Sequence, residues 1–289
     1  MVAVTSPVLA SRTEGSNVYI HQVDDWYGTE DKLRFMQAAH ARYTVPAPPD
    51  YFGWVMSWLG MSAGERLLDV GCGFGAFHAS AKKQGFRVIG LDQSQGLVGQ
   101  MYLSSKAAQL GVLPMCAWAE EMPLRDDIAD GTMCNYVMHH LDDAARKSAL
   151  EHMRRVTKNG RSVVITAHAA NQMQRLRELH FEAATQNGFV PRLGAFDWFN
   201  LDHIEEVSRV FPEVRVESEE SRFEFPETEI VVRYYASQII DLIENQPADN
   251  AHRKPLLEWI RPKIDDVIRR DGVFKEYKSL GCFVATVRK

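Results

Sequence analysis

The sequence has few cysteines and no Cys-x-x-Cys pair. Its four cysteines (Cys72, Cys116, Cys134 and Cys282) are scattered along 289 residues. Scattered thiols are typical of a reducing compartment, and less typical of a disulfide framework or a zinc site. We therefore expect free cysteines, no metal and a cytoplasmic protein.

Long apolar runs and an excess of positive charge are also missing. No stretch of about 18 apolar residues is present, which predicts no membrane span and no membrane partner. The first residues lack a basic segment followed by an apolar one, so no signal peptide is expected. The formal net charge is −5, and a surface of that sign does not favour a phosphate backbone. This excess of negative charge predicts a small-molecule partner and no nucleic acid.

What the sequence does have is a short apolar run that ends in alternating glycines, in the order Leu67, Leu68, Asp69, Val70, Gly71, Cys72, Gly73, Phe74 and Gly75. Glycine tolerates positive φ and close backbone approach, which an abrupt turn from strand to helix requires. We expect a helix from Ala76 to Lys83, whose first N–H groups face the space above the strand end. The pattern predicts a nucleotide-type site at the carboxyl edge of a parallel strand.

The glycine spacing separates two kinds of nucleotide. A dinucleotide fingerprint needs a third glycine, in Gly-x-Gly-x-x-Gly, where this chain has Ala76. Asp69 would oppose a pyrophosphate but suits a ligand that carries an ammonium and a sulfonium. The stretch from Asp69 to Gly75 resembles the acid-x-Gly-x-Gly-x-Gly signature of class I S-adenosylmethionine-dependent methyltransferases, in particular the small-molecule, type 11-like members. The resemblance implies S-adenosyl-L-methionine as cofactor, with Asp69, Gly71, Cys72, Gly73 and Gly75 among the binding residues.

Strand-like and helix-like segments alternate through the central part of the chain, which predicts βαβ units and a parallel sheet. The expected strands are 66–70, 87–91, 115–118, 132–138 and 162–167. The fold class is therefore α/β, a Rossmann-like doubly wound and mostly parallel sheet. The resemblance adds a final antiparallel strand and a helical cap or lid. We expect four regions: a disordered 1–16, a helical lid at 17–60, a cofactor-binding core at 61–168, and further strands with cap insertions over the substrate site at 169–289.

Further cofactor contacts are expected after three strands. Asp92 stands about 20 residues beyond Gly71, where this fold places a carboxylate over ribose hydroxyls; the alternative is an aspartate that caps the helix at Ser94. The resemblance places Gln93 near the adenine, Ala119 at the adenine through its N–H, and Glu120 near the exocyclic amine. By the same likeness, Asn135 and Tyr136 lie beside the methionine part of the ligand, after the fourth strand. Trp118 departs from the family, which usually has an acid there.

The expected catalytic residues are His139, His140 and Tyr27. His140 matches a histidine that ends the fourth-strand motif in many family members, and histidine is a suitable base near neutral pH. Two adjacent histidines point in different directions, so at most one faces the substrate; the alternative is that His140 packs behind the site and His139 is incidental. Tyr27 belongs to a segment that folds over the cofactor in relatives. The fourth strand lacks the prolines of methyltransferases that act on nucleobase amines, which again argues against nucleic acid.

The sequence thus predicts methyl transfer to a small apolar or aromatic metabolite, at an O, N or C atom. Aromatic residues that cluster at 26–27, 54–58 and 196–199 suggest the acceptor wall. A monomer or homodimer is expected. Two alternatives stay open: a nicotinamide-dependent oxidoreductase on a similar sheet, and a protein that binds S-adenosylmethionine without catalysis.

Overall fold

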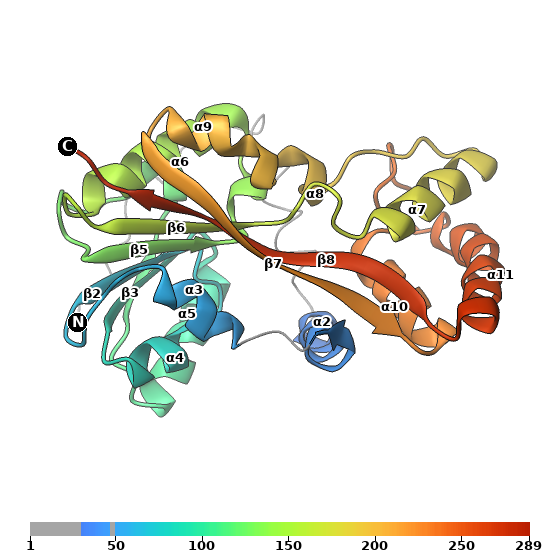
Figure 1. Ribbon diagram of the computed structural model, residues 1–289, viewed down its shortest axis with the longest axis horizontal. Coiled ribbons are helices and arrows are strands. Elements are labelled where there is room, and N and C mark those ends of the chain that lie inside the picture. Colours follow the sequence, from blue (N-terminus) through green and yellow to red (C-terminus); the bar gives the residue numbers. More distant parts are fainter. Residues whose placement is uncertain (1–29, 47–49) are drawn as a thin grey trace.

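The computed structural model describes residues 30–46 and 50–289 (Figure 1). The expected disordered start, residues 17–29 of the expected lid, and Tyr27 lie outside the described residues. The part of the lid that is described contains two helices, α2 and α3.

The centre of the described chain is an eight-stranded mixed sheet with the order β1-β7-β8-β6-β5-β2-β3-β4. Strands β2 to β6 run parallel to one another, whereas β8 pairs antiparallel with both β6 and β7. The expected fold class is confirmed, including the late antiparallel strand. The strands are β1 (Thr44–Val45), β2 (Arg66–Val70), β3 (Arg87–Asp92), β4 (Leu113–Cys116), β5 (Gly131–Asn135), β6 (Ser162–Ala167), β7 (Glu213–Phe225) and β8 (Phe274–Thr286).

Helices follow or connect most of these strands. The α-helices are α2 (Glu30–Tyr43), α3 (Tyr51–Ser57), α4 (His78–Lys83), α5 (Gln95–Ala107), α6 (Asp143–Val156), α7 (Gln174–Gln186), α8 (Ala195–Trp198), α9 (Ile204–Ser208), α10 (Thr228–Gln238) and α11 (Arg253–Asp271). Short 3-10 turns are η2 (Ala119–Glu121), η3 (Met138–His140) and η4 (Leu201–His203). Local signals start several helices: Ser94 Oγ accepts from Leu97 N at 3.3 Å before α5, and Asp142 Oδ1 accepts from Ala145 N at 2.8 Å before α6.

The parallel strands bury side chains on both faces. Along β2, Leu68 and Val70 pack in a cluster with α6, whereas Leu67 packs in a second cluster with α3 and α4. Successive residues of a strand point to opposite faces, so a strand covered on both sides must be apolar throughout. This explains why Leu67, Leu68 and Val70 are all apolar, and it places Asp69 on the same face as Leu67.

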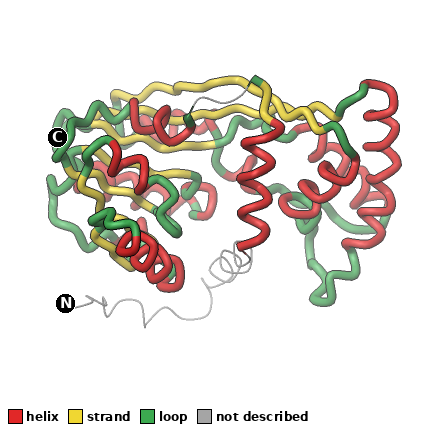
Figure 2. The backbone as a smooth tube through the Cα atoms, turned by 90° about the horizontal axis from the view of Figure 1, so that it is seen from below, coloured by secondary structure: helices red, strands yellow, loops and turns green. Residues whose placement is uncertain are grey.

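The cap is built on the two longest strands. Figure 1 shows β7 and β8 running together out of the sheet toward α10 and α11, and Figure 2 shows the same ribbon extending past the core. Helices α7, α10 and α11 pack on this extension around a hydrophobic core of their own, formed by Leu176, Phe223, Tyr235, Ile260 and Phe274 among others. Helix α2 stands against β7 and α10. The four region boundaries drawn from the sequence stay predictions.

Several expected elements differ from those in the structure. The helix expected from Ala76 begins at His78, and the strand expected over 132–138 is β5, which ends at Asn135. Strand β5 stops early because Tyr136 has a positive φ of 54°, which no continuing strand permits. Two residues of the suggested acceptor wall pack elsewhere: the Trp58 ring packs under Arg215, and Phe199, 1% exposed, packs in the core against Phe283.

Candidate active site

The glycine loop between β2 and α4 folds back onto the end of β3. Gly71 N and Cys72 N donate to Leu91 O at 2.7 and 2.9 Å, and Gly73 N donates to Asp92 Oδ2 at 2.9 Å. These three amides are therefore directed at β3 and are not arranged as a phosphate cradle. This arrangement disfavours a pyrophosphate ligand. The expectation that the first N–H groups of the following helix face the ligand concerns other amides and stays a prediction.

Glycine is required at the start of this loop for steric reasons. Gly71 has a φ of +68°, and a Cβ there would lie 2.1 Å from Cγ2 of Val137. A Cβ at Gly73 would meet nothing within 4 Å, so open space adjoins the loop at that residue. The loop therefore approaches the end of β5 closely at one point and leaves room at another.

Asp92 is the residue that ties the loop to α5. Its two carboxylate oxygens accept from Gly73 N and from Ser94 N, both at 2.9 Å, and the residue is 9% exposed. The contact to Ser94 N holds the residue that caps α5, because the Oγ of Ser94 itself accepts from Leu97 N. The ribose contact stays a prediction.

Asp69 holds the loop from beneath. It is 2% exposed, and its Oδ2 lies 3.1 Å from Nε2 of His78, the first residue of α4. Burial raises the pKa of the Asp69 carboxyl, while His78 and Asn135 act in the opposite direction. Its place on the α4 face makes Asp69 a support of the loop, and direct contact with the cofactor stays a prediction.

The expected adenine and methionine contacts lie at neighbouring strand ends. Ala119 and Glu120 form η2 after β4 and are 8% and 9% exposed. Gln93 follows Asp92 directly, and the main chain of Asp92 is joined to the segment after β4 through Ala117 N, 3.0 Å from Asp92 O. Asn135 ends β5, and its buried Nδ2 makes no conventional hydrogen bond within the described chain. The structure thus brings the expected cofactor residues to one edge of the sheet.

An aromatic stack stands beyond the ends of β5 and β6. The rings of Tyr136 and His168 are stacked with centroids 4.5 Å apart, and the ring of Tyr51 in α3 lies nearly parallel to that of Tyr136 with centroids 6.3 Å apart. Tyr136 N donates to Thr166 Oγ1 at 3.0 Å, which fixes the turn. Burial raises the pKa of Tyr136 to about 12, so its hydroxyl is neutral at physiological pH. Sequence analysis placed Tyr136 beside the ligand but did not predict this stack.

His139 and His140 lie on η3, next to the stack. His139 is 5% exposed, its ring lies 5.9 Å from that of His168, and burial with its histidine neighbours lowers its pKa well below 6.5. Burial lowers the pKa of His140 to about 4. Both rings are therefore neutral at pH 7. The structure brings these two expected catalytic residues together with His168, while their catalytic roles stay predictions.

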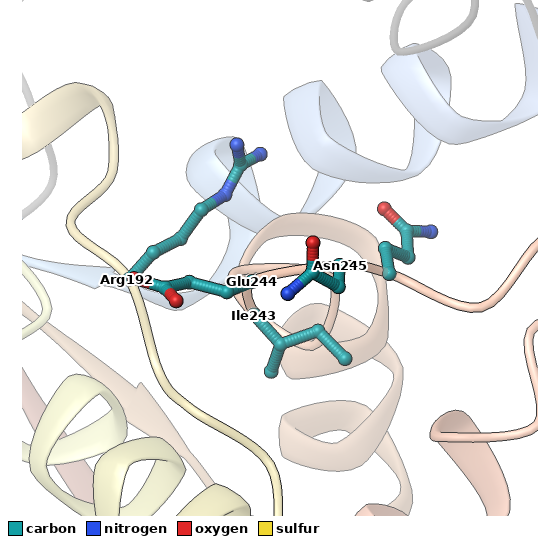
Figure 3. A pocket seen from close by; sticks show the side chains of 5 residues that line it. Arg192, Ile243, Glu244 and Asn245 are labelled. Atoms are coloured by element: carbon teal, nitrogen blue, oxygen red, sulfur yellow. The ribbon is translucent and has the colours of Figure 1, made fainter.

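Two shallow hollows lie away from the glycine loop. One, drawn in Figure 3, is formed on the cap by Arg192 and the segment 243–246. The other is lined by residues of the loop after β6 and of β7 and β8, including Asn171, Tyr277 and Ser279. Within residues 30–46 and 50–289, no group of three or more His, Cys, Asp or Glu side chains is placed to bind a metal ion. No helix in these same ranges is long and apolar enough to cross a bilayer.

The comparisons with known proteins agree with this geometry. Residues 68–165, which run from β2 to β6, match a family described as "Methyltransferase domain". Residues 68–165 of this chain therefore form an S-adenosylmethionine-dependent methyltransferase domain. S-adenosyl-L-methionine is the cofactor of this family, as expected from the glycine loop. Nothing in the comparisons supports the oxidoreductase alternative.

Relatives of the methyltransferase domain differ in what their names say they act on. A 23S rRNA (uracil(1939)-C(5))-methyltransferase from Shewanella amazonensis is 30% identical over 158 residues, 54% of this chain and 34% of that protein. A malonyl-[acyl-carrier protein] O-methyltransferase from Serratia marcescens is 32% identical over 123 residues, 41% of this chain and 45% of that protein. The matched regions therefore span less than half of either relative.

A solved structure extends the likeness of fold to the cap. Phosphoethanolamine N-methyltransferase 2 from Haemonchus contortus, in complex with S-adenosyl-L-methionine, has a TM-score of 0.59 and 18% identity, and the match covers 96% of this chain and 62% of that one. At that identity the match establishes a shared fold.

The expectation of a small-molecule partner and no nucleic acid was wrong. An rRNA methyltransferase shares the matched domain, so neither a net charge of −5 nor the absent prolines excludes RNA. Net charge reports on the average surface, whereas substrate choice depends on a few local contacts.

Proposed function

We propose that this chain transfers a methyl group from S-adenosyl-L-methionine to an apolar or aromatic acceptor group held against Tyr136 and His168. One observation supports this proposal most strongly. The glycine loop is bound to Asp92 through Gly73, and it lies near the Tyr136–His168 stack, because both are at the carboxyl ends of neighbouring parallel strands. In open α/β sheets this edge is where ligands bind.

The cofactor fits the residues present at this edge. Open space adjoins Gly73, the Asp92 carboxylate lies beside it, and the buried Nδ2 of Asn135 makes no conventional hydrogen bond within the described chain. We propose Asp92 for the ribose hydroxyls, Gln93, Ala119 and Glu120 for the adenine, and Asn135 for the methionine part. When bound, the cofactor supplies a methyl group already activated by a sulfonium charge. The protein therefore needs mainly to align the acceptor and exclude water.

The acceptor is proposed to lie along the aromatic stack. Tyr51, Tyr136 and His168 are half-buried, and the parts of their rings that stay accessible offer contact area to an apolar or aromatic group with little loss of side-chain freedom. The low pKa of His168, about 3, keeps this wall uncharged at pH 7. A small aromatic metabolite and an unstacked nucleobase both present such a group, so this chemistry does not separate them.

His140 is proposed as the proton acceptor wherever the acceptor atom must lose a proton. Its imidazole is neutral above a pKa of about 4, so it is ready to accept a proton at neutral pH. A base with so low a pKa contributes modestly, because proton transfer is most effective when the pKa lies near the working pH. His139 is more deeply buried and is proposed to position His140, whose ring centroid is 4.1 Å from its own.

The direct test follows methyl label from the cofactor into acceptors. The purified chain is incubated with methyl-labelled S-adenosyl-L-methionine and, in separate arms, a phenolic metabolite library and total RNA. Label in either arm, lost in Asp92→Ala and reduced in His140→Gln, supports the proposal and identifies the source of the acceptor. Binding of the cofactor with no transfer in both arms favours the non-catalytic alternative. Label that persists in Asp92→Ala contradicts the proposed cofactor site.

A further inference from the structure

A lysine is buried where the sheet meets the cap. Lys278 of β8 is 9% exposed, its Nζ donates to Thr44 Oγ1 at 2.9 Å, and the same atom lies 5.0 Å from the centroid of the Phe223 ring. Within the described residues its ammonium makes no ion pair. A buried ammonium without an anion is unfavourable, so such a lysine is usually paired or functional.

Lys278 stands just beyond the acceptor side of the sheet. The pairing of β8 with β6 ends at Gly281 opposite Ala167, so β8 continues past the carboxyl end of β6 to reach Lys278. Thr44, which receives the lysine hydrogen bond, comes directly after α2. His40 of α2 lies against the same Phe223 ring, with centroids 4.9 Å apart. Residues of α2, β1, β7 and β8 thus meet beyond the end of β6, the strand that His168 follows.

The charges around Lys278 leave it as a lone cation among neutral rings. Burial and the nearby lysine lower the pKa of His40 to about 3, and burial, His140 and the same lysine lower that of His168 to about 3. Burial lowers the pKa of Lys278 itself to about 8, so it is mainly protonated at pH 7.

Two other titratable groups face this region, and neither forms an ion pair with the lysine. Glu276, on the same face of β8, accepts from Arg175 N and Leu176 N at 3.0 and 2.8 Å, and burial raises its pKa to about 7. Tyr234 of α10 lies 3.3 Å from His40 Nε2 through its hydroxyl, and burial keeps that phenol neutral.

We propose that Lys278, together with His40 and His168, forms a subsite for an anionic group of the acceptor, a carboxylate or a phosphate ester. The inference rests on the proposed function and adds the acceptor's charge to it. His168 belongs to both parts, because its ring stacks on Tyr136 and the charge of Lys278 helps to lower its pKa. An aromatic acid or aryl phosphate would place its ring on the stack and its anion at the lysine.

The test compares matched anionic and neutral aromatic probes on the protein saturated with S-adenosylhomocysteine. Benzoate, phenyl phosphate and benzamide are titrated at constant ionic strength, and each affinity is obtained from the shift in melting temperature. We expect an anion to bind about tenfold or more tightly than benzamide. The preference should decline as the pH rises through about 8, where Lys278 loses its proton. The relative affinities of benzoate and phenyl phosphate distinguish the two anion types.

Three variants assign the preference to the lysine. Lys278→Met should remove it and Lys278→Arg should keep it, while Lys275→Met, at an exposed position of the same strand, should leave it unchanged. Equal binding of anions and benzamide by the wild-type protein, which requires no variant, would overturn the inference and leave the proposed function intact. Anion preference retained in Lys278→Met would overturn it as well. Failure of the wild-type protein to bind S-adenosylhomocysteine would overturn both.

Discussion

The imidazole of His168 lies flat against the phenol ring of Tyr136, with centroids 4.5 Å apart and planes inclined by 26°. His168 follows β6 and Tyr136 follows β5, so the contact joins the ends of two adjacent parallel strands. It forms the wall on which we place the acceptor. The wall depends on the unusual backbone of Tyr136, whose positive φ turns the chain sharply after β5.

Two substitutions at Tyr136 should separate the packing role of its ring from the role of its hydroxyl. Tyr136→Phe keeps the stack with Tyr51 and His168, so methyl transfer and stability should remain near those of the wild type. Tyr136→Ala removes the ring and should cost about 2 kcal/mol or more of unfolding free energy, with a large loss of transfer. Urea unfolding and the labelled-methyl assay measure both effects. Equal activity of the alanine and wild-type proteins would contradict the acceptor wall.

Substitution at Gly71 should damage the loop for a defined steric reason. Gly71→Ala introduces a Cβ that would lie 2.1 Å from Val137 Cγ2, at a φ of +68°. We expect a loss of about 1–3 kcal/mol in stability and weaker cofactor binding. Val137→Ala in the same chain should recover part of both, because it removes the clash but not the backbone strain. Gly73→Ala is the control: it shares the positive φ but meets no atom within 4 Å. Equal effects of the Gly71 and Gly73 variants would exclude the clash as the cause.

Stability should fall as the pH is lowered from 6.5 toward 4. Burial lowers the pKa of His40 and His168 to about 3 and that of His140 to about 4 in the folded chain. Unfolding returns them to about 6.5, so in this range the unfolded chain binds more protons. Their contribution is therefore complete above pH 6.5 and is lost progressively as the pH falls toward the folded-state values.

The measurement for this pH effect is the free energy of unfolding in urea at several pH values. Titration of carboxylates adds to the slope at the acid end, so a variant is needed to isolate the histidines. His139→Phe removes one buried imidazole, whose pKa is also well below 6.5, and should give a shallower decline between pH 6.5 and 5. An unchanged slope in this variant would exclude His139 as a contributor.

The fold could be predicted from the sequence because its signals are local. The glycines after β2 and the alternation of apolar runs with helical segments depend on neighbouring residues, and they correctly predicted a mostly parallel sheet. The cofactor followed from the spacing between Asp69 and Gly75. Where the prediction was in error, as at the start of α4 and the end of β5, the boundary is set by tertiary contacts such as the Tyr136 turn on Thr166.

The acceptor side could not be predicted because it is assembled from distant segments. Tyr51, Tyr136, His168 and Lys278 come from α3, the end of β5, the end of β6 and β8, and no short pattern joins them. Aromatic density alone misled the sequence interpretation, since Trp58 and Phe199 pack elsewhere. One feature of the sequence indicates that Lys278 is unusual. It is a lysine on a largely apolar face of its strand, which it shares with Phe274, Leu280 and Cys282.

The central claim is that the loop at Gly73 and the carboxylate of Asp92 hold the nucleoside of S-adenosylmethionine. Calorimetric titration with S-adenosylhomocysteine tests it most directly, and NAD serves as the competing ligand. The control variant is Asp126→Ala, which changes an exposed aspartate paired with Arg155. We predict that the wild-type and Asp126→Ala proteins bind S-adenosylhomocysteine and that neither binds NAD. Asp92→Ala should lower the affinity for S-adenosylhomocysteine by about hundredfold or more, because hydrogen bonds to a charged acceptor are strong. Near-native affinity of Asp92→Ala for S-adenosylhomocysteine, or binding of NAD in its place, would contradict the account.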